Sequence, residues 1–294
     1  MATTLIPERR GGSIAALPPS PSYGRWLQVG IVVGLMAFLF VGVLANMAHD
    51  WWTDPAWSQG LLLPPLAFYV AWIHRSRTFS VPAEMDRRGL FVTAFACLSF
   101  LAGRLASEEF TTRISFVVLL TGVIWTFWGL KRLKTLAFPM LLLATMVPLP
   151  ALLYNSLAAP LQLFASDLGS RVAQAAGIAL FRDGNIIQLA NISLGVEEAC
   201  SGLNSLSALC VGALLFGYIN CSRLVNRIAV FLLAIPLAIA INVLRIAGTA
   251  ILADYNQDFA MGFYHMFSGW LVFVVGATAL YLFAQGLHAV SERS

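Results

Sequence analysis

Long apolar runs recur along the chain, separated by short segments that carry most of its charged residues. A helix that crosses a bilayer needs about 20 apolar residues, and eight runs approach or exceed that length. The predicted transmembrane helices are residues 26–47, 60–73, 89–106, 114–130, 133–153, 202–219, 228–252 and 268–287, of which the second is the shortest. The fold class is therefore an all-α polytopic membrane protein. We expect a flexible cytoplasmic tail at residues 1–25 and a single transmembrane domain at residues 26–294.

The segment between the fifth and sixth predicted helices, residues 154–199, follows a different pattern. Over residues 157–180, apolar positions recur at helical spacing with polar positions opposite, which predicts an amphipathic helix at the membrane interface rather than a ninth span. Its apolar face contains Leu157, Leu161, Phe164, Leu168, Val172, Ala176 and Ala179, and its polar face contains Ser166, Asp167, Ser170, Arg171 and Gln174. After a turn signal at residues 182–185, apolar residues alternate at period two from Ile187 to Val196, which predicts a small β-hairpin.

Composition agrees with this pattern, and the distribution of charge sets the topology. Hydrophobic residues make up 59% of the 294 positions and charged residues 11%. Soluble domains average about 45–50% and about 25%, so a soluble enzyme is excluded. With the N-terminus inside, 13 of the 18 Lys and Arg residues fall in cytoplasmic segments, and 10 of the 14 acidic residues fall outside. This distribution predicts cytoplasmic termini and places the amphipathic helix and hairpin on the outer face.

The basic residues are scattered, and the four cysteines share no CxxC spacing. We therefore expect no nucleic-acid partner, no structural zinc and no disulfide framework. The sequence contains no motif for a cofactor or a catalytic metal, so the expected cofactor is none. The lipid bilayer is the expected environment.

Reactive residue types gather on the predicted outer face. Cys200 lies where the outer segment meets the sixth helix, with Glu197 three residues before it and Asn204 four residues after it. These spacings bring side chains together on a helix. A helix N-terminus favours a thiolate, which would make Cys200 a nucleophile. The alternative is that Cys200 is a small apolar filler and that Glu197 only complements the helix dipole.

Arg245 lies inside the seventh predicted helix, about seven residues from its outer end, or roughly 10 Å at 1.5 Å per residue. A charged side chain at that depth is costly and tends to face a polar cavity. Asn242 and Thr249 share its face of the helix. The alternatives are that the guanidinium reaches the outer headgroups or forms an ion pair with Asp254.

His265 lies just before the eighth predicted helix, where an imidazole can exchange protons near neutral pH. The alternative is a histidine that only sits among interfacial aromatic residues. The topology puts Cys200, Arg245 and His265 on one side, although the charge count used neither the cysteine nor the histidine. Together they describe a thiol enzyme. The thiolate would attack a carbonyl, the imidazole would move the proton, and the guanidinium would stabilise the oxyanion or the thiolate.

The same residues carry a family resemblance. The segments 199–206 (ACSGLNSL) and 242–246 (NVLRI), and His265 followed by Gly269 and Trp270, resemble the exosortase/archaeosortase family of multi-span cysteine transpeptidases. The segment 57–62 (WSQGLL) is similar to the Tyr-Ser-His-Gly element of that family. It departs from the element at two positions, with tryptophan in place of tyrosine and glutamine in place of histidine. The family often has arginine at the position of Asn204.

The resemblance implies an activity and a location. Members are described as recognising membrane-anchored proteins with a C-terminal signal, which consists of a short motif such as Pro-Glu-Pro, a transmembrane helix and a basic tail (PEP-CTERM type). They are thought to cleave near the motif and pass the acyl group to an acceptor, and their genes often accompany exopolysaccharide assembly genes. The triad maps to Cys200, Arg245 and His265. Such an enzyme would lie in a bacterial inner membrane, with its site facing the periplasm.

Two other functions are compatible with the sequence. A membrane cysteine protease that only hydrolyses would differ in its acceptor, which no residue reveals. A non-catalytic transporter or exopolysaccharide assembly component would instead line a substrate path with Arg245 and the outer acidic residues. Transport predicts a polar track through several helices, whereas the inner halves of the last three predicted helices are apolar apart from small polar residues such as Ser205 and Ser207.

Overall fold

A computed structural model describes residues 23–190, 192–196, 203–259 and 264–293. The chain divides into two compact units, Met1–Gly42 and Val43–Ser294. In the first unit, residues 23–42 form the N-terminal part of helix α1 (Tyr23–Thr53). The second unit contains the rest of α1 and every other described helix and strand, and it therefore contains all of the predicted site residues.

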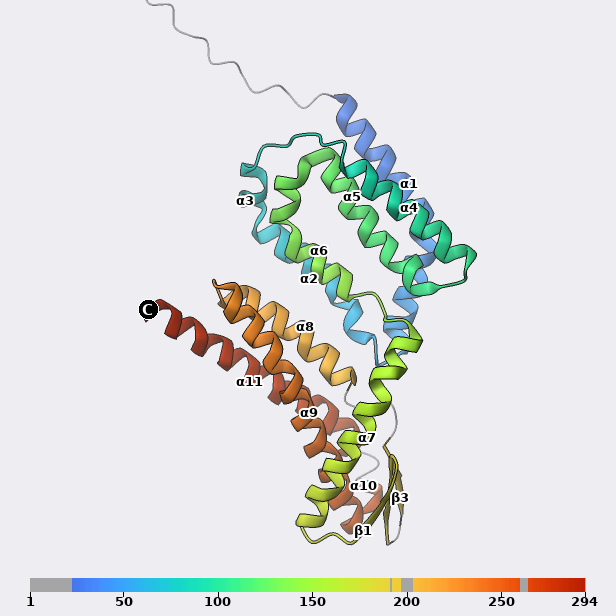
Figure 1. Ribbon diagram of the computed structural model, residues 1–294, viewed down its shortest axis with the longest axis vertical. Coiled ribbons are helices and arrows are strands. Elements are labelled where there is room, and N and C mark those ends of the chain that lie inside the picture. The colour runs from blue at the N-terminus through green and yellow to red at the C-terminus, as the bar shows by residue number, and fades with distance from the viewer. Residues whose placement is uncertain (1–22, 191, 197–202, 260–263, 294) are drawn as a thin grey trace, which may run out of the picture. The chain divides into compact units, whose positions relative to one another are not determined.

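Helices dominate the described part of the chain (Figure 1). After α1 come η1 (Ser58–Leu61), α2 (Leu63–Ile73), α3 (Arg75–Ser80), α4 (Gly89–Leu105), α5 (Glu109–Thr135), α6 (Ala137–Thr145) and α7 (Ala151–Ala175). Strands β1 (Leu180–Asp183), β2 (Ile186–Leu189) and β3 (Ser193–Gly195) come next. The chain then continues with α8 (Leu203–Asn220), α9 (Leu224–Tyr255), α10 (Gln257–Phe259) and α11 (His265–Arg293).

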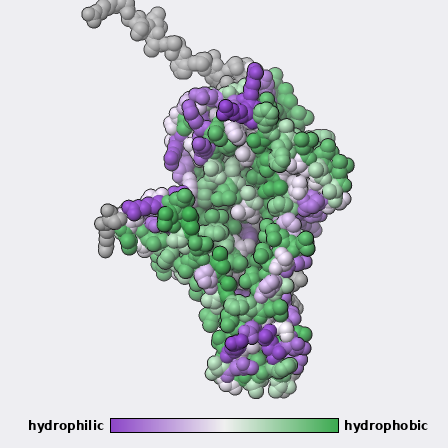
Figure 2. All heavy atoms as spheres, viewed as in Figure 1, coloured by the Kyte–Doolittle hydropathy of each residue, from purple (hydrophilic) through white to green (hydrophobic). Residues whose placement is uncertain are grey.

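Five of the described helices are long and apolar enough to cross a membrane. They are Trp26–Thr53, Glu109–Thr135, Leu203–Asn220, Leu224–Tyr255 and Phe267–Ser291. Two more of the eight predicted spans are shorter apolar helices, Ser58–Ile73 and Gly89–Leu105. Figure 2 shows hydrophobic side chains over most of the visible face, with hydrophilic ones gathered over the strands and, separately, over α3. The described part of the chain is thus mostly helical, with five helices of spanning length and a small sheet, while the count of eight spans and the cytoplasmic termini stay predictions.

The prediction of one continuous helix over residues 133–153 is wrong. The chain leaves helical geometry at Leu136 (φ −98°, ψ 5°), and α6 then lasts only nine residues. The helix ends two residues before the Val147–Pro148 bond, because proline disfavours helical geometry in the residue before it. Pro150 then precedes the first residue of α7. A hydropathy pattern does not detect these backbone breaks, since residues 136–144 and 146–153 are apolar or proline on both sides of Thr145.

The amphipathic segment does form a helix, α7, and two serines of its predicted polar face are buried inside the protein. Ser166 and Ser170, assigned to the polar outer face, are 0% and 3% exposed, whereas Leu157 and Phe164 from the apolar face are 45% and 50% exposed. Small residues of α7 pack on α9, and Gly169 lies against the side chain of Ile246. In a membrane protein, small residues let helices approach closely while large apolar ones can face lipid.

The predicted hairpin is confirmed and has a third strand. The strands form one antiparallel sheet in the order β1-β2-β3, and Gly184 makes the first turn with a φ of 61°, a value that glycine adopts easily. The alternation is visible in the burial, because Ile187, Leu189 and Leu194 are all less than 10% exposed. These side chains share a core with Val243 and Ile246 of α9, so the sheet is anchored to a long helix.

Helices α8, α9 and α11 form a second packed group. Their shared core consists of small and apolar residues, Leu209, Ala213, Cys221, Val230, Ala234, Ala238, Leu280 and Ala284. At one level, a Cβ added at Gly276 would lie 3.0 Å from Leu209 and 3.1 Å from Ile241, so the three helices meet there at close range. Figure 1 shows α8 and α11 running in the same direction and α9 running opposite.

We predict that Gly169→Leu destabilises the protein by about 1–3 kcal/mol, because overpacking must push α7 away from α9. A Cβ at this position would already lie 2.7 Å from Cγ2 of Ile246. The measurement is the thermal midpoint of the purified protein in detergent. Gly286→Leu in α11 is the matched control, since nothing lies within 4 Å of a Cβ added there. An equal fall in both variants would contradict the packing of α7 on α9.

Candidate functional site

The start of α8, Arg245 and the start of α11 lie at the same end of the three-helix group. From the level at which Leu209, Ile241 and Gly276 meet, Asn204 is five residues back along α8 and Arg245 is four residues forward along α9. Because α9 runs opposite to α8, both steps lead the same way, by about 6–8 Å at 1.5 Å per residue. Seven residues back along α11, or about 10 Å, lies Gly269.

The guanidinium of Arg245 lies against the first turns of α11. A Cβ added at Gly269 would be 3.8 Å from both Cζ and Nη2 of Arg245. The side chain is half-buried, and within the described part of the chain it forms no ion pair with Asp254. The ion-pair alternative is therefore wrong. His265 is the first residue of α11, so the structure brings Arg245 beside the helix start that carries the predicted histidine.

Tyr264 is a neighbour of Arg245 that the sequence analysis missed. Its hydroxyl lies against Gly248 of α9, where a Cβ would overlap the Tyr264 oxygen. Burial raises the pKa of the Tyr264 hydroxyl above its ordinary value, while the positive charge of Arg245 acts in the opposite direction. The sequence contains one signal for this contact, which is Gly248, three residues after Arg245. A glycine leaves space beside a helix that an aromatic ring can fill.

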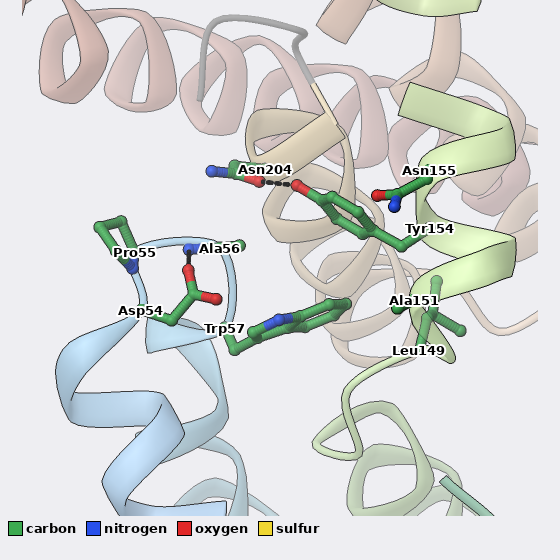
Figure 3. Close-up of a pocket in the computed structure, with 9 residues that line it drawn as sticks. All are labelled: Asp54, Pro55, Ala56, Trp57, Leu149, Ala151, Tyr154, Asn155 and Asn204. Atoms are coloured by element: carbon green, nitrogen blue, oxygen red, sulfur yellow. Dashed lines mark hydrogen bonds between the residues drawn. The ribbon is translucent and has the colours of Figure 1, made fainter. Parts of the chain in front are cut away.

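Asn204 belongs to a pocket that involves three separate parts of the chain. Its side-chain oxygen accepts a hydrogen bond of 2.9 Å from the Tyr154 hydroxyl of α7. The pocket has a volume of about 360 Å³ and opens beside this bond (Figure 3). Its described lining residues are Asp54, Pro55, Ala56, Trp57, Leu149, Ala151, Tyr154, Asn155 and Asn204. Of these residues, the sequence indicated only Trp57 and Asn204 as candidates, and their distance along the chain gave no reason to expect them together.

The element similar to the family's Tyr-Ser-His-Gly motif reaches the same part of α8. Trp57 packs on Tyr154 with ring centroids 5.3 Å apart. Gln59 donates a 3.0 Å hydrogen bond to the hydroxyl of Ser207, one turn after Asn204. Gly60 leaves space for the indole of Trp51, which a Cβ would overlap. The element therefore has a place in the structure despite its two departures from the motif, because its glutamine reaches the first turn of α8.

Several predicted site residues fall outside the described part of the chain. Cys200 and Glu197 lie in the segment 197–202, and of His265 only the backbone is described. Asn242 is placed and is 1% exposed, one helical turn before Arg245. Cys200 lies four positions before Asn204 in the sequence, so the covalent chain keeps their Cα atoms within about 14 Å.

The described side chains offer polar and cationic chemistry at this end of the helices. Among them, no group of three or more His, Cys, Asp or Glu residues could hold a metal ion. A half-buried guanidinium suits an anion or a developing oxyanion. The amide and hydroxyl groups of Asn204, Tyr154 and Gln59 instead fix the geometry of the first turns of α8.

We predict that the bond between Gln59 and Ser207 couples η1 to α8 by about 0.5–1.5 kcal/mol. A double-mutant cycle of Gln59→Ala and Ser207→Ala, measured by unfolding of the purified protein, tests this. A second cycle that pairs Gln59→Ala with Ser205→Ala serves as the control and should show no coupling. The same value in both cycles would mean that the bond does not link the two elements.

Comparison with known proteins identifies the family of this chain. The chain matches the transmembrane exosortase family over residues 51–282, which is most of its length. Neither a search of curated proteins nor a search of solved structures gave a match. The matched range contains the Trp57–Gly60 element, the start of α8, Arg245 and the start of α11. Together with the five helices of spanning length, this match shows that the chain is a multi-pass membrane protein of the transmembrane exosortase family.

Proposed function

We propose that the protein is an exosortase-like membrane cysteine transpeptidase that cleaves the C-terminal sorting signals of exported proteins. Its substrates would be membrane-anchored proteins with a PEP-CTERM type signal, cut on the periplasmic side of a bacterial inner membrane. The observation that carries the proposal is the family match, which covers the polar end of the three-helix group. The eight spans and the cytoplasmic termini are part of the same proposal.

The reaction would proceed through a thioester on Cys200. The sulfur of the thiolate forms a bond to the carbonyl carbon of the scissile peptide, and the carbon–nitrogen bond breaks. His265 takes the thiol proton and gives it to the leaving amine. An acceptor then attacks the thioester, the acyl group moves to it, and the thiol is restored. Arg245 would stabilise the negative charge on the carbonyl oxygen during both steps.

The position of Arg245 supports its role in this scheme. A guanidinium inside a helix of spanning length is costly unless it faces polar groups, and here its charge acts on the Tyr264 hydroxyl just before α11. The start of α8 is at the same end of the group, within about 14 Å of chain from Cys200. A substrate helix lying beside the spans would deliver its motif to this end.

The supporting residues would act by holding these groups in place. Asn204 is fixed by the Tyr154 hydroxyl, and Asn242 is buried one turn below Arg245. Glu197 lies three residues before Cys200 in the sequence and would act on the orientation or charge of the thiol. The large exposed apolar side chains of α7 are suited to the interface position proposed for that helix.

We predict that cleavage requires the thiol. A reporter with a Pro-Glu-Pro type C-terminal signal, expressed in cells with the protein, should be shortened on a size-resolved blot. Cys200→Ala and Cys200→Ser should abolish this, because the nucleophile is lost or is replaced by a hydroxyl that the site does not activate. Cys97→Ala is the control, since that thiol is exposed on α4 and has no part in the proposal.

Equal shortening by wild type and Cys200→Ala would show that Cys200 is not the nucleophile. The mass of the new C-terminus distinguishes the two enzyme functions. A free carboxylate alone would indicate a protease that only hydrolyses, and an added group would indicate transfer. Full biological function in Cys200→Ala would favour a non-catalytic transporter or exopolysaccharide assembly component.

We predict that Arg245→Lys lowers the cleavage rate by roughly tenfold to a hundredfold, because an ammonium lacks the planar fork of the guanidinium. The rate is measured with the same reporter at matched protein levels. Arg171→Lys is the control, because Arg171 is an exposed residue whose ion pair with Asp167 lies on the surface of α7. Wild-type rates in Arg245→Lys would mean that positive charge alone is sufficient.

A further inference from the structure

The pocket beside Asn204 has a charge pattern that the cleavage chemistry does not use. Among its described lining residues, Asp54 alone is charged at neutral pH, and none is Arg, Lys or His. An anionic ligand would meet a carboxylate there without a compensating cation. A cationic ligand would meet a carboxylate without competition from a lysine or an arginine. The charge of the pocket therefore favours a cation.

Asp54 is held in a defined position by local structure. Its Oδ1 accepts a 2.8 Å hydrogen bond from the backbone N–H of Ala56, which closes a turn between α1 and η1. The end of α1 is itself fixed, because Asp50 pairs with Arg113 of α5 at 2.7 Å. Figure 3 shows the Asp54 carboxylate and the Trp57 ring on one side of the pocket and Tyr154 and Asn155 across from them.

The aromatic rings add a second feature that suits a cation. Trp57 and Tyr154 are tilted by 56° to each other, with ring centroids 5.3 Å apart. The face of such a ring attracts an ammonium group within about 6 Å of its centroid. The side-chain oxygen of Asn155 can accept a hydrogen bond from an N–H donor. The volume of about 360 Å³ is that of a small-molecule site.

We propose that this pocket binds the primary ammonium group of the acceptor that receives the acyl group. The inference rests on the proposed function and names the chemical class of the second substrate. Asp54 would provide the counter-charge, Trp57 and Tyr154 the aromatic faces, and Asn155 a hydrogen-bond acceptor. Asn204 lines the pocket, and the covalent chain keeps the Cα atom of Cys200 within about 14 Å of that of Asn204.

The transfer step balances with an amine as acceptor. The bound ammonium loses one proton to water and becomes the free amine. Its nitrogen forms a bond to the thioester carbonyl carbon, and the carbon–sulfur bond breaks with its electrons on sulfur. The second proton leaves the nitrogen and restores the Cys200 thiol. The products are an amide and the free enzyme, with no oxidant or further reactant.

Binding is tested without any cleavage. The full-length Cys200→Ala protein in phosphatidylcholine nanodiscs is titrated with glycinamide, and binding is followed by saturation-transfer NMR. Glycolamide, which has a hydroxyl in place of the ammonium, is the matched probe, and methyl glucoside is a neutral sugar probe. We expect glycinamide to bind and the other two probes not to bind. Equal binding of glycolamide, or binding of the sugar alone, would overturn the proposal.

Asp54→Asn tests the residue assignment, because an asparagine oxygen can still accept the hydrogen bond from Ala56. We expect glycinamide affinity to fall roughly fivefold in this variant, through the loss of the negative charge. The control is Asp258→Asn, an exposed acidic residue of α10 outside the lining set, which should bind as the unmodified chain does. Unchanged affinity in Asp54→Asn would overturn the assignment.

Transfer provides a separate readout. With Cys200 present and the reporter as donor, added glycinamide should give a glycinamide adduct, and Asp54→Asn should lower the ratio of adduct to free acid by roughly fivefold. Repeating the reaction in phosphatidylethanolamine nanodiscs distinguishes a lipid amine from a soluble one by the mass of the product. Cleavage without Asp54-dependent binding would overturn this inference alone. If glycinamide binding depends on Asp54 but cleavage does not depend on Cys200, the proposed function is overturned, while the assignment of the pocket as an ammonium site is supported.

Discussion

The close contact of Leu209, Ile241 and Gly276 fixes the level of the candidate site. Lipid supplies little hydrophobic drive between helices, so tight packing of small residues must hold the group together. Gly276 and the alanines of the shared core allow α8, α9 and α11 to approach that closely. With the spacing set there, the antiparallel direction of α9 brings Arg245 to the end where α8 and α11 begin. A shift of one helix by one turn would move its polar residue by about 5 Å relative to the others.

Two glycines lie near the guanidinium of Arg245, whose charge is costly to place in an apolar helix. Gly269 lies against Arg245, and Gly248 makes room for Tyr264 one turn further along α9. A Cβ at Gly248 would overlap the Tyr264 oxygen, so the phenol would have to move, whereas a Cβ at Gly269 would make an ordinary contact with the guanidinium. The charge of Arg245 acts on the Tyr264 hydroxyl, whose oxygen is a polar group that can accept a hydrogen bond from a guanidinium. The presence of glycine at position 248 is therefore explained by local packing against Tyr264, and it does not depend on the identity of the substrate.

The sequence predicted the features that depend on local pattern. Alternation at period two identified the strands, since the buried positions Ile187 and Leu194 are set by neighbours a few residues away. The break before α7 was missed because hydropathy averages over Leu136 and the prolines that come after α6. The burial of Ser166 was not predicted, because helical periodicity separates polar from apolar positions but does not show that small polar residues pack against another helix. The pocket was missed because its contacts join residues far apart in sequence.

The reacting groups and the pocket belong to different elements, so the residues of one could change while those of the other stay the same. The proposed reacting groups are Cys200, which precedes α8 in the sequence, Arg245 of α9 and His265 of α11. The charge and aromatic faces of the pocket come instead from the segment between α1 and η1 and from α7. Asn204 is the described residue that belongs to both, and Tyr154 holds it by a single hydrogen bond. The Tyr154–Asn204 and Gln59–Ser207 hydrogen bonds both link the pocket side to α8, and neither involves Arg245. The pocket could therefore change its chemistry without displacing Arg245. Departures from a family motif at Trp57 and Gln59 are therefore compatible with an intact reaction centre, since Trp57 lines the pocket and Gln59 bonds to Ser207, and neither contact involves Arg245.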